Sequence, residues 1–76
     1  MDQRANRMKT LIINTFFDCL EKLDFTQITI GKISDQAMIN RSTFYRYFSD
    51  KYILRDTIVN DIVKDFADHM EVDFLH

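Results

Sequence analysis

The stretch "NRSTFYRYFSDK", residues 40–51, decides the fold, because it gathers bases and aromatics in a chain whose formal net charge is −2 over 76 residues. Phe44, Tyr45 and Phe48 have the apolar bodies expected of core residues. If they face inward, the polar side chains between them face outward. The other chemistry-bearing residues of the stretch are Arg41, Ser42, Thr43, Arg46, Tyr47 and Lys51.

Two predicted helices meet within this stretch. Asn40 is a good N-cap residue and predicts a short helix over about residues 41–48. Ser49 or Asp50 then caps a further helix over about residues 51–72. Apolar residues at helical spacing mark one stripe of that last helix, namely Leu54, Ile58, Ile62, Phe66 and Met70, with Val59, Val63 and Ala67 beside them.

Two more helices are predicted before the stretch. The first covers about residues 4–23, and we expect Asp24 to end it in a left-handed conformation, which Asp tolerates better than most residues. A link of residues 25–28 leads to Thr29, which caps a second helix over about residues 30–37. The apolar face of the first helix consists of Met8, Leu11, Ile12, Thr15, Phe16, Cys19, Leu20 and Leu23. Ile13 and Phe17 widen this face, so we expect a helix that is buried on more than one side.

The second and third helices have the spacing of a helix-turn-helix unit. Their crossing needs a small residue, which Ser34 supplies, while Ile39 anchors the third helix and Phe44 points back into the core. The N-terminal residues of the third helix then face outward, where they can enter a DNA major groove. We therefore expect an all-α fold in one domain over residues 1–76: a three-helix, homeodomain-like helix-turn-helix bundle followed by a truncated fourth helix.

Composition favours the same fold and a nucleic-acid partner for one half of the chain. The absence of proline and the single glycine leave little turn chemistry for a sheet. The one cysteine, Cys19, excludes an internal disulfide framework. We find neither a secretory leader nor an apolar span of about 18 residues, so we expect a cytoplasmic location. The formal net charge is +2 over residues 1–51 and −4 over residues 52–76. Because a phosphate backbone repels an acidic segment, we expect DNA to contact only residues 1–51.

The run "FTQITIGKISDQAMINRSTFYRYFSDKYIL", residues 25–54, resembles the DNA-binding segment of the TetR family of bacterial transcriptional regulators. That segment reads approximately T-v-x-x-I-A-x-x-A-G-V-s-x-g-t-l-Y-x-h/y-F-x-s-K-x-x-L, and "TFYRYFSDKYIL" matches its most specific part. The resemblance implies a DNA-binding head, in a repressor that binds a two-fold operator as a homodimer. Matching positions are Thr29, Ile30, Ile33, Ala37, Ile39, Thr43, Phe44, Tyr45, Tyr47, Phe48, Lys51 and Leu54.

The chain departs from the family pattern at four points. Ser34 stands for the usual alanine, and Asp24 for the glycine that ends the first helix. Met38 stands for the glycine of A-G-V, at a cost on the order of 1 kcal/mol if the backbone there has a positive φ. Family members continue into a larger domain that binds an effector and dimerises. The sequence ends at His76, so we expect that domain to be absent.

Several of the candidate DNA contacts have two readings. The resemblance implies that Tyr45 and Tyr47 reach phosphates, and the alternative is core tyrosines with solvated hydroxyls. Lys51 combines an ammonium with a helix N-terminus, which favours a phosphate, or it is an ordinary solvated lysine. The full set of candidates is Thr29, Gly31, Arg41, Ser42, Thr43, Tyr45, Arg46, Tyr47 and Lys51, with Ser42 and Thr43 suited to base or phosphate bonds.

Each of the remaining candidates also has more than one possible role. Arg41 either donates to a guanine in bidentate geometry or binds a phosphate without reading sequence. Thr29 bonds a phosphate, caps its helix, or does both. Arg46 lies on the outer side of its helix as a DNA-backbone contact or a solvated residue. Gly31 lets a phosphate approach the backbone closely, or is simply tolerated near a helix end.

Other functions find little support in the sequence. No catalytic Ser/His/Asp or Cys/His set can be assembled, and His69 and His76 lack metal-ligand spacing. We therefore expect no enzyme, metal or cofactor. The lower stripe of the fourth helix predicts an interface. An alternative function is a small helical protein-interaction module that uses this stripe without binding DNA. The interface residues are Ile62, Val63, Phe66 and Met70.

Overall fold

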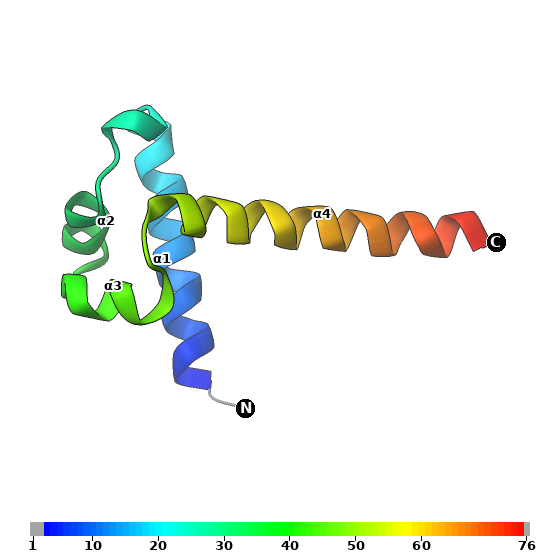
Figure 1. Ribbon diagram of the computed structural model, residues 1–76, viewed down its shortest axis with the longest axis horizontal. Helices are drawn as coiled ribbons and strands as arrows, with labels where there is room; N and C mark the ends of the chain where they lie inside the picture. The colour runs from blue at the N-terminus through cyan, green and yellow to red at the C-terminus, as the bar shows by residue number, and fades with distance from the viewer. Residues whose placement is uncertain (1–2, 76) are drawn as a thin grey trace.

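The computed structural model describes the backbone of residues 3–75 and the side chains of residues 6–67. Over this range the chain is helical and has no strand, which confirms the predicted all-α class. The second predicted helix has the expected bounds, the first is shifted by one residue, the third ends at Tyr47 and the fourth is three residues longer. The elements in order are α1 (Gln3–Lys22), the 3-10 turn η1 (Phe25–Gln27), α2 (Ile30–Ala37), α3 (Arg41–Tyr47) and α4 (Lys51–Leu75) (Figure 1).

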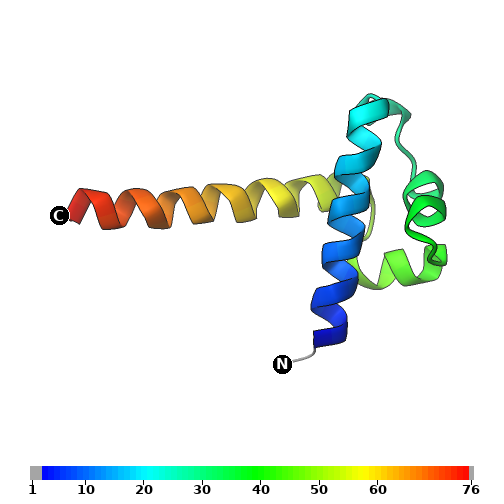
Figure 2. The ribbon, with the colours of Figure 1, turned by 180° about the vertical axis from the view of Figure 1, so that it is seen from behind.

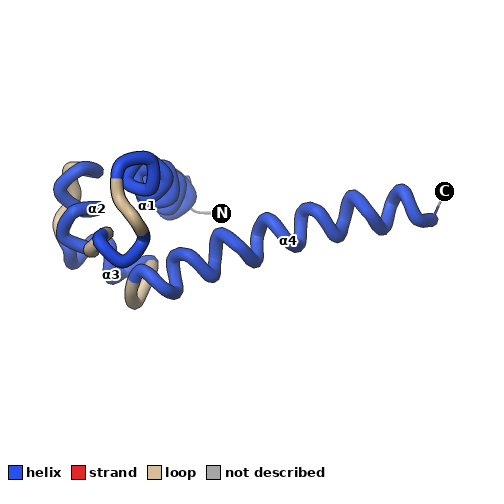
Figure 3. The backbone as a smooth tube through the Cα atoms, turned by 90° about the horizontal axis from the view of Figure 1, so that it is seen from above, coloured by secondary structure: helices blue, strands red, loops and turns tan. Residues whose placement is uncertain are grey.

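The helices form a head and an arm. α2 and α3 lie on one side of α1, and α4 crosses α1 near its own start and leaves on the other side (Figures 1 and 2). Seen from above, the later turns of α4 run away from the other helices (Figure 3). A 25-residue helix is about 37 Å long. The arm therefore accounts for most of the longest dimension in principal extents of 47 × 32 × 18 Å.

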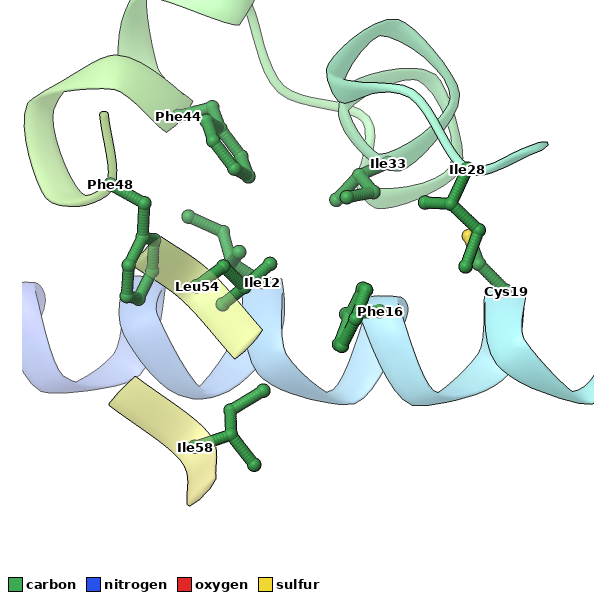
Figure 4. Packing of buried hydrophobic residues seen from close by; sticks show 9 residues of the cluster. All are labelled: Ile12, Phe16, Cys19, Ile28, Ile33, Phe44, Phe48, Leu54 and Ile58. Atoms are coloured by element: carbon green, nitrogen blue, oxygen red, sulfur yellow. The ribbon is translucent and has the colours of Figure 1, made fainter. Parts of the chain in front are cut away.

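A single apolar core holds the head together. Ile33 and Phe44 point from the helix-turn-helix toward α1, and Leu54 brings the start of α4 into the same cluster (Figure 4). Burying each of these large side chains stabilises the fold by about 1.5–3 kcal/mol. Thus the first two turns of α4 belong to the head. The buried cluster consists of Ile12, Phe16, Cys19, Ile28, Ile33, Phe44, Phe48, Leu54 and Ile58.

The turn between α2 and α3 is a Schellman motif with a non-glycine at its left-handed position. Met38 has φ 60° and ψ 43°. The N–H of Met38 donates to Asp35 O at 3.2 Å and the N–H of Ile39 donates to Ser34 O at 2.9 Å, which are the two bonds of this motif. Glycine is favoured at such a position because it has no Cβ. Because Met38 has a positive φ, the predicted free-energy cost of a non-glycine residue, on the order of 1 kcal/mol, applies at this position.

Two local expectations are wrong. Asp24 has φ −69° and ψ 154°, so it ends α1 in extended backbone and not in the left-handed region. Its N–H donates to Gln27 Oε1 at 3.2 Å, which stabilises the 3-10 turn where a plain link was expected.

Tyr45 was expected in the core, but it is 54% exposed. Tyr47 packs against the core instead, because α3 is rotated so that Phe44 and Tyr47 share its inner side.

The apolar face of α1 is only partly covered. Leu11, Phe17 and Leu20 each remain more than a third exposed, although they belong to the predicted stripe. Among the described side chains, those of α2, α3 and the first two turns of α4 share the core with α1, and they leave the flanks of the stripe open. The expectation that α1 is buried on more than one side is therefore wrong for these residues.

Candidate nucleic-acid interface

The outer face of α3 gathers four of the sequence-predicted contacts. Arg41, Ser42, Tyr45 and Arg46 are all exposed, and at 100° per residue they occupy an arc of about 140° on one side of the helix. Phe44 anchors the opposite side, with its ring centroid 5.9 Å from that of Phe48. The arrangement presents two guanidinium groups and two hydroxyls together, which suits phosphate and base-edge contacts. We call these four residues the outer face.

Two further candidates on α3, Thr43 and Tyr47, flank the outer face or lie behind it. The ring of Tyr47 is half-buried against the core, and Thr43 is half-buried at the edge. Tyr45, in contrast, packs edge-on against Phe44 at 6.0 Å between ring centroids and keeps much of its surface accessible. An aromatic residue with an accessible hydroxyl can combine packing and hydrogen bonding. Tyr45 is therefore better placed than Tyr47 to meet a ligand.

Thr29 caps α2, as one of its two readings predicted. Its Oγ1 accepts a hydrogen bond from the N–H of Lys32 at 3.1 Å, and its carbonyl accepts from Ile33 at 3.1 Å. Capping uses the hydroxyl as an acceptor, so its hydrogen is still available to donate to a phosphate oxygen. Thr29 is exposed, and the cap and a DNA contact are compatible.

Arg41 joins the first turns of α2 and α3. A Cβ added to Gly31 would lie 2.5 Å from Nη2 and 3.2 Å from Cζ of Arg41. The guanidinium therefore rests on the backbone of Gly31, which is buried beneath it. In this arrangement a phosphate meets Arg41 before it meets Gly31. The contact brings the α2 terminus with Thr29 next to the outer face of α3.

Lys51 is bound to the loop that precedes α2. Its Nζ donates to Phe25 O at 2.7 Å and to Ile28 O at 2.8 Å, so protein carbonyls occupy two of its three donors. Asp50, one of the two predicted caps, accepts the N–H of Ile53 at 2.8 Å and places a carboxylate at the start of α4. A carboxylate there competes with a phosphate for the same helix end. The predicted contact between Lys51 and a phosphate stays a prediction.

The sequence analysis did not identify two exposed basic residues of the head, Lys32 and Arg55. Lys32, one turn after the Thr29 cap, is exposed and its Nζ donates to Gln27 O at 3.1 Å. Its position at the third residue of a capped helix could have identified it. Arg55 pairs with Asp56 at 3.2 Å and lies over the ring of Phe25 at 5.0 Å. That contact joins α4 to η1 and has no signal in the local sequence.

Cys19 behaves as a buried apolar residue. Burial, with a smaller effect from the Asp18 carboxylate, raises the pKa of its thiol above the ordinary value of 9.0. Its Sγ lies 3.7 Å from Gln36 Oε1 as a weak donor between α1 and α2. Within the part of the chain that the structure describes, no three His, Cys, Asp or Glu residues gather as metal ligands. No described helix is long and apolar enough to cross a membrane.

The arm carries an exposed apolar face. Ile62 and Val63 are each 58% exposed and Phe66 is 66% exposed, as expected for residues beyond the head. Tyr52 and Val59 continue the same side of α4 toward the head and are about half exposed. Met70, the fourth predicted interface residue, lies outside the residues whose side chains are described. We call Tyr52, Val59, Ile62, Val63 and Phe66 the arm face.

Comparison with known proteins supports the helix-turn-helix interpretation. The chain is 32% identical over 73 residues to an uncharacterized HTH-type transcriptional regulator, YxbF, of Bacillus subtilis (strain 168). The match covers 95% of this chain and 19% of the relative, so the chain spans about a fifth of that protein's length. No family model matches the chain, and no solved structure matches it.

Proposed function

We propose that this chain is the sequence-specific DNA-binding head of a bacterial transcriptional regulator of the TetR type. The outer face of α3 carries this proposal: Arg41 and Arg46 stand beside Ser42 and Tyr45 on the exposed side of a helix that Phe44 anchors to the core. The similarity to the HTH-type transcriptional regulator of Bacillus subtilis is consistent with it. The TetR assignment rests on the resemblance of residues 25–54.

In the proposed mechanism, α3 enters the major groove of double-stranded DNA. Ser42 and Thr43 are offered to base edges, while Arg46, Thr29 and the tyrosines Tyr45 and Tyr47 bond to phosphates. Arg41 faces α2, where its guanidinium suits the phosphate beside Thr29 better than a guanine. Phosphate contacts fix the register of the helix, and base contacts select the sequence.

The wider role follows from the resemblance. Two heads acting on a two-fold operator as a homodimer would read two half-sites about 34–36 Å apart. Repression would follow from occupying the operator, and such a regulator works in the bacterial cytoplasm without enzymatic activity. A single head makes few phosphate contacts, so its affinity is expected to be weak and to fall steeply with salt.

Fluorescence anisotropy with a mixed-sequence duplex tests the proposal. We expect binding at low salt that weakens between about 50 and about 200 mM salt. Arg46→Ala should weaken binding about three- to tenfold and reduce the salt slope by about 0.9 if it contacts a phosphate. Lys64→Ala, which removes an exposed base from the arm, is the matched control and should bind like the unmodified chain. Equal effects of the two substitutions, or no binding at low salt, would contradict the proposal.

The arm face favours a second candidate function, a protein-interaction module. Apolar side chains exposed to this extent on one side of a helix usually mark an interface. Sedimentation velocity over a range of protein concentrations tests this function. Phe66→Asp should abolish any self-association, while Asn60→Asp, an exposed change away from the arm face, should not. Self-association that depends on Phe66, without DNA binding, would favour this function over the first.

A further inference from the structure

Lys51 is bound to the loop that leads into α2, across a long separation in sequence. Its two bonds, to the carbonyls of Phe25 and Ile28, span 26 and 23 residues, with Nζ–O distances of 2.7 and 2.8 Å. The residue is half-buried. These contacts fix the start of α4 to the loop between α1 and α2.

The second of these bonds acts on the peptide that joins Ile28 to Thr29. The carbonyl of Ile28 belongs to the same planar unit as the N–H of Thr29, so holding that oxygen restricts how Thr29 is oriented. The Ile28 side chain is fully buried and fixes the other side of the same residue. Thr29 in turn caps α2 through Lys32 N–H at 3.1 Å. Lys51 thereby helps to set the direction of the Thr29 hydroxyl.

Aromatic rings keep the ammonium in place. Nζ of Lys51 lies 4.5 Å from the ring centroid of Phe25 and 5.6 Å from that of Tyr52. The two rings themselves meet edge-on at 5.3 Å, and Phe25 also packs edge-on against Phe16 at 6.1 Å. A cation beside such rings is attracted by their π-faces. An ammonium held by two carbonyls and two rings is poorly placed to move to a phosphate.

We infer that Lys51 is a positioning residue for DNA binding, which acts through Thr29, and that it is not itself a phosphate ligand. This inference rests on the proposed function. It differs from the first interpretation of Lys51, in which the ammonium meets the DNA backbone. The two roles differ in their effect on salt dependence, because only a lysine that neutralises a phosphate contributes to counterion release.

The unmodified chain provides the first test. Lysine side-chain NMR should show the ammonium hydrogens of Lys51 protected from exchange before any DNA is added. Their shifts should stay nearly constant when a duplex saturates the protein, while the Thr29 amide shifts. An unprotected ammonium in the free chain, or a Lys51 ammonium shift as large as that of the Thr29 amide, would overturn the inference.

Lys51→Met provides the second test, because it keeps the aliphatic stem and removes the charge and both bonds. We expect DNA affinity to fall about three- to tenfold, the salt slope to change by less than about 0.3, and amide exchange to quicken at residues 25–29. Lys64→Met removes the same charge from the arm and should leave affinity and exchange unchanged. A slope reduced by about 0.9, with normal exchange at residues 25–29, would identify a direct phosphate contact and overturn the inference.

The outcomes separate the two proposals. If the unmodified chain binds no DNA, the proposed function fails and this inference fails with it. If the unmodified chain binds DNA and Lys51→Met lowers the salt slope as a phosphate ligand would, the function stands and only the inference fails. Should Lys51→Met unfold, the side-chain NMR of the unmodified protein still decides.

Discussion

The guanidinium of Arg41, at the start of α3, rests on the backbone of Gly31, in the first turn of α2, so that a Cβ there would lie 2.5 Å from Nη2. The contact links the two helix N-termini that the proposed interface uses. It also places the Arg41 charge over the first turn of α2, the helix that Thr29 caps. Of the two proposed roles of Arg41, contact with a base or contact with a phosphate, this geometry favours the phosphate contact.

Gly31→Ala should preserve the fold and weaken DNA binding through Arg41. The atoms that a methyl group displaces belong to the end of a flexible side chain, and alanine is a better helix former by about 1 kcal/mol. We expect an affinity loss of about three- to tenfold in the native background and none in an Arg41→Ala background. Anisotropy on the double-mutant cycle measures this coupling. Equal losses in both backgrounds would mean that Gly31 acts independently of Arg41.

Met38→Gly should stabilise the protein. Met38 has φ 60° and is 90% exposed, so the substitution relieves backbone strain and removes almost no packing. The added freedom of glycine in the unfolded chain offsets part of the gain, which leaves about 0.5–1 kcal/mol. Urea unfolding of Met38→Gly and of Met38→Ala, which keeps a Cβ, measures the effect. A Met38→Gly protein no more stable than the alanine variant would refute the strain at this turn.

Ser34→Ala should also raise stability. Ser34 is 1% exposed and its Oγ has no hydrogen-bond partner among the described residues. An unsatisfied buried hydroxyl costs about 1–3 kcal/mol, and alanine fits the same close crossing of helices. We expect a gain of about 1 kcal/mol in the free energy of unfolding. Ser42→Ala, at an exposed position, should change it by less than about 0.5 kcal/mol. A loss of stability in Ser34→Ala would indicate that the hydroxyl is bonded.

Cys19 should make the protein less stable at alkaline pH. Its pKa is raised by burial and by Asp18, so the folded state favours the neutral thiol. That contribution is complete below the unfolded pKa of about 9 and is lost as pH rises through the higher folded value. The free energy of unfolding of the native chain minus that of Cys19→Ala should be constant near pH 7 and fall above pH 9. A difference that stays constant through pH 10.5 would contradict the raised pKa.

Much of the fold could be predicted from the sequence because its signals are local. Thr29 and Asn40 mark helix starts by residue type, and the spacing of Ile33 and Phe44 places two helices on one core. The rotation of α3 about its axis was harder to predict. With aromatics at positions 44, 45, 47 and 48 in and just after a seven-residue helix, either of two sides could face the core. That ambiguity explains why Tyr45 was placed in the core and Tyr47 was not.

The site could be predicted as a set of residues but not as a set of contacts. Two contacts join separate elements of the fold: the bonds from Lys51 to Phe25 and Ile28, and the contact of Arg41 with Gly31. The local sequence of these segments contains no pattern that predicts either contact. The prediction for Asp24 was wrong for a related reason. Its extended backbone conformation goes with the hydrogen bond from its N–H to the side chain of Gln27, and the tolerance of Asp for the left-handed conformation did not decide it.

An amide-shift NMR titration of the labelled chain with a mixed-sequence duplex, at low and then moderate salt, tests the central claim most directly. It detects weak binding, so the low affinity of a single head does not hide the answer. The account predicts shifts concentrated at Thr29, Gly31 and residues 41–47, shrinking as salt rises, with the arm beyond Ile58 unaffected. No shifts in these segments at low salt, or shifts confined to the arm, would contradict it.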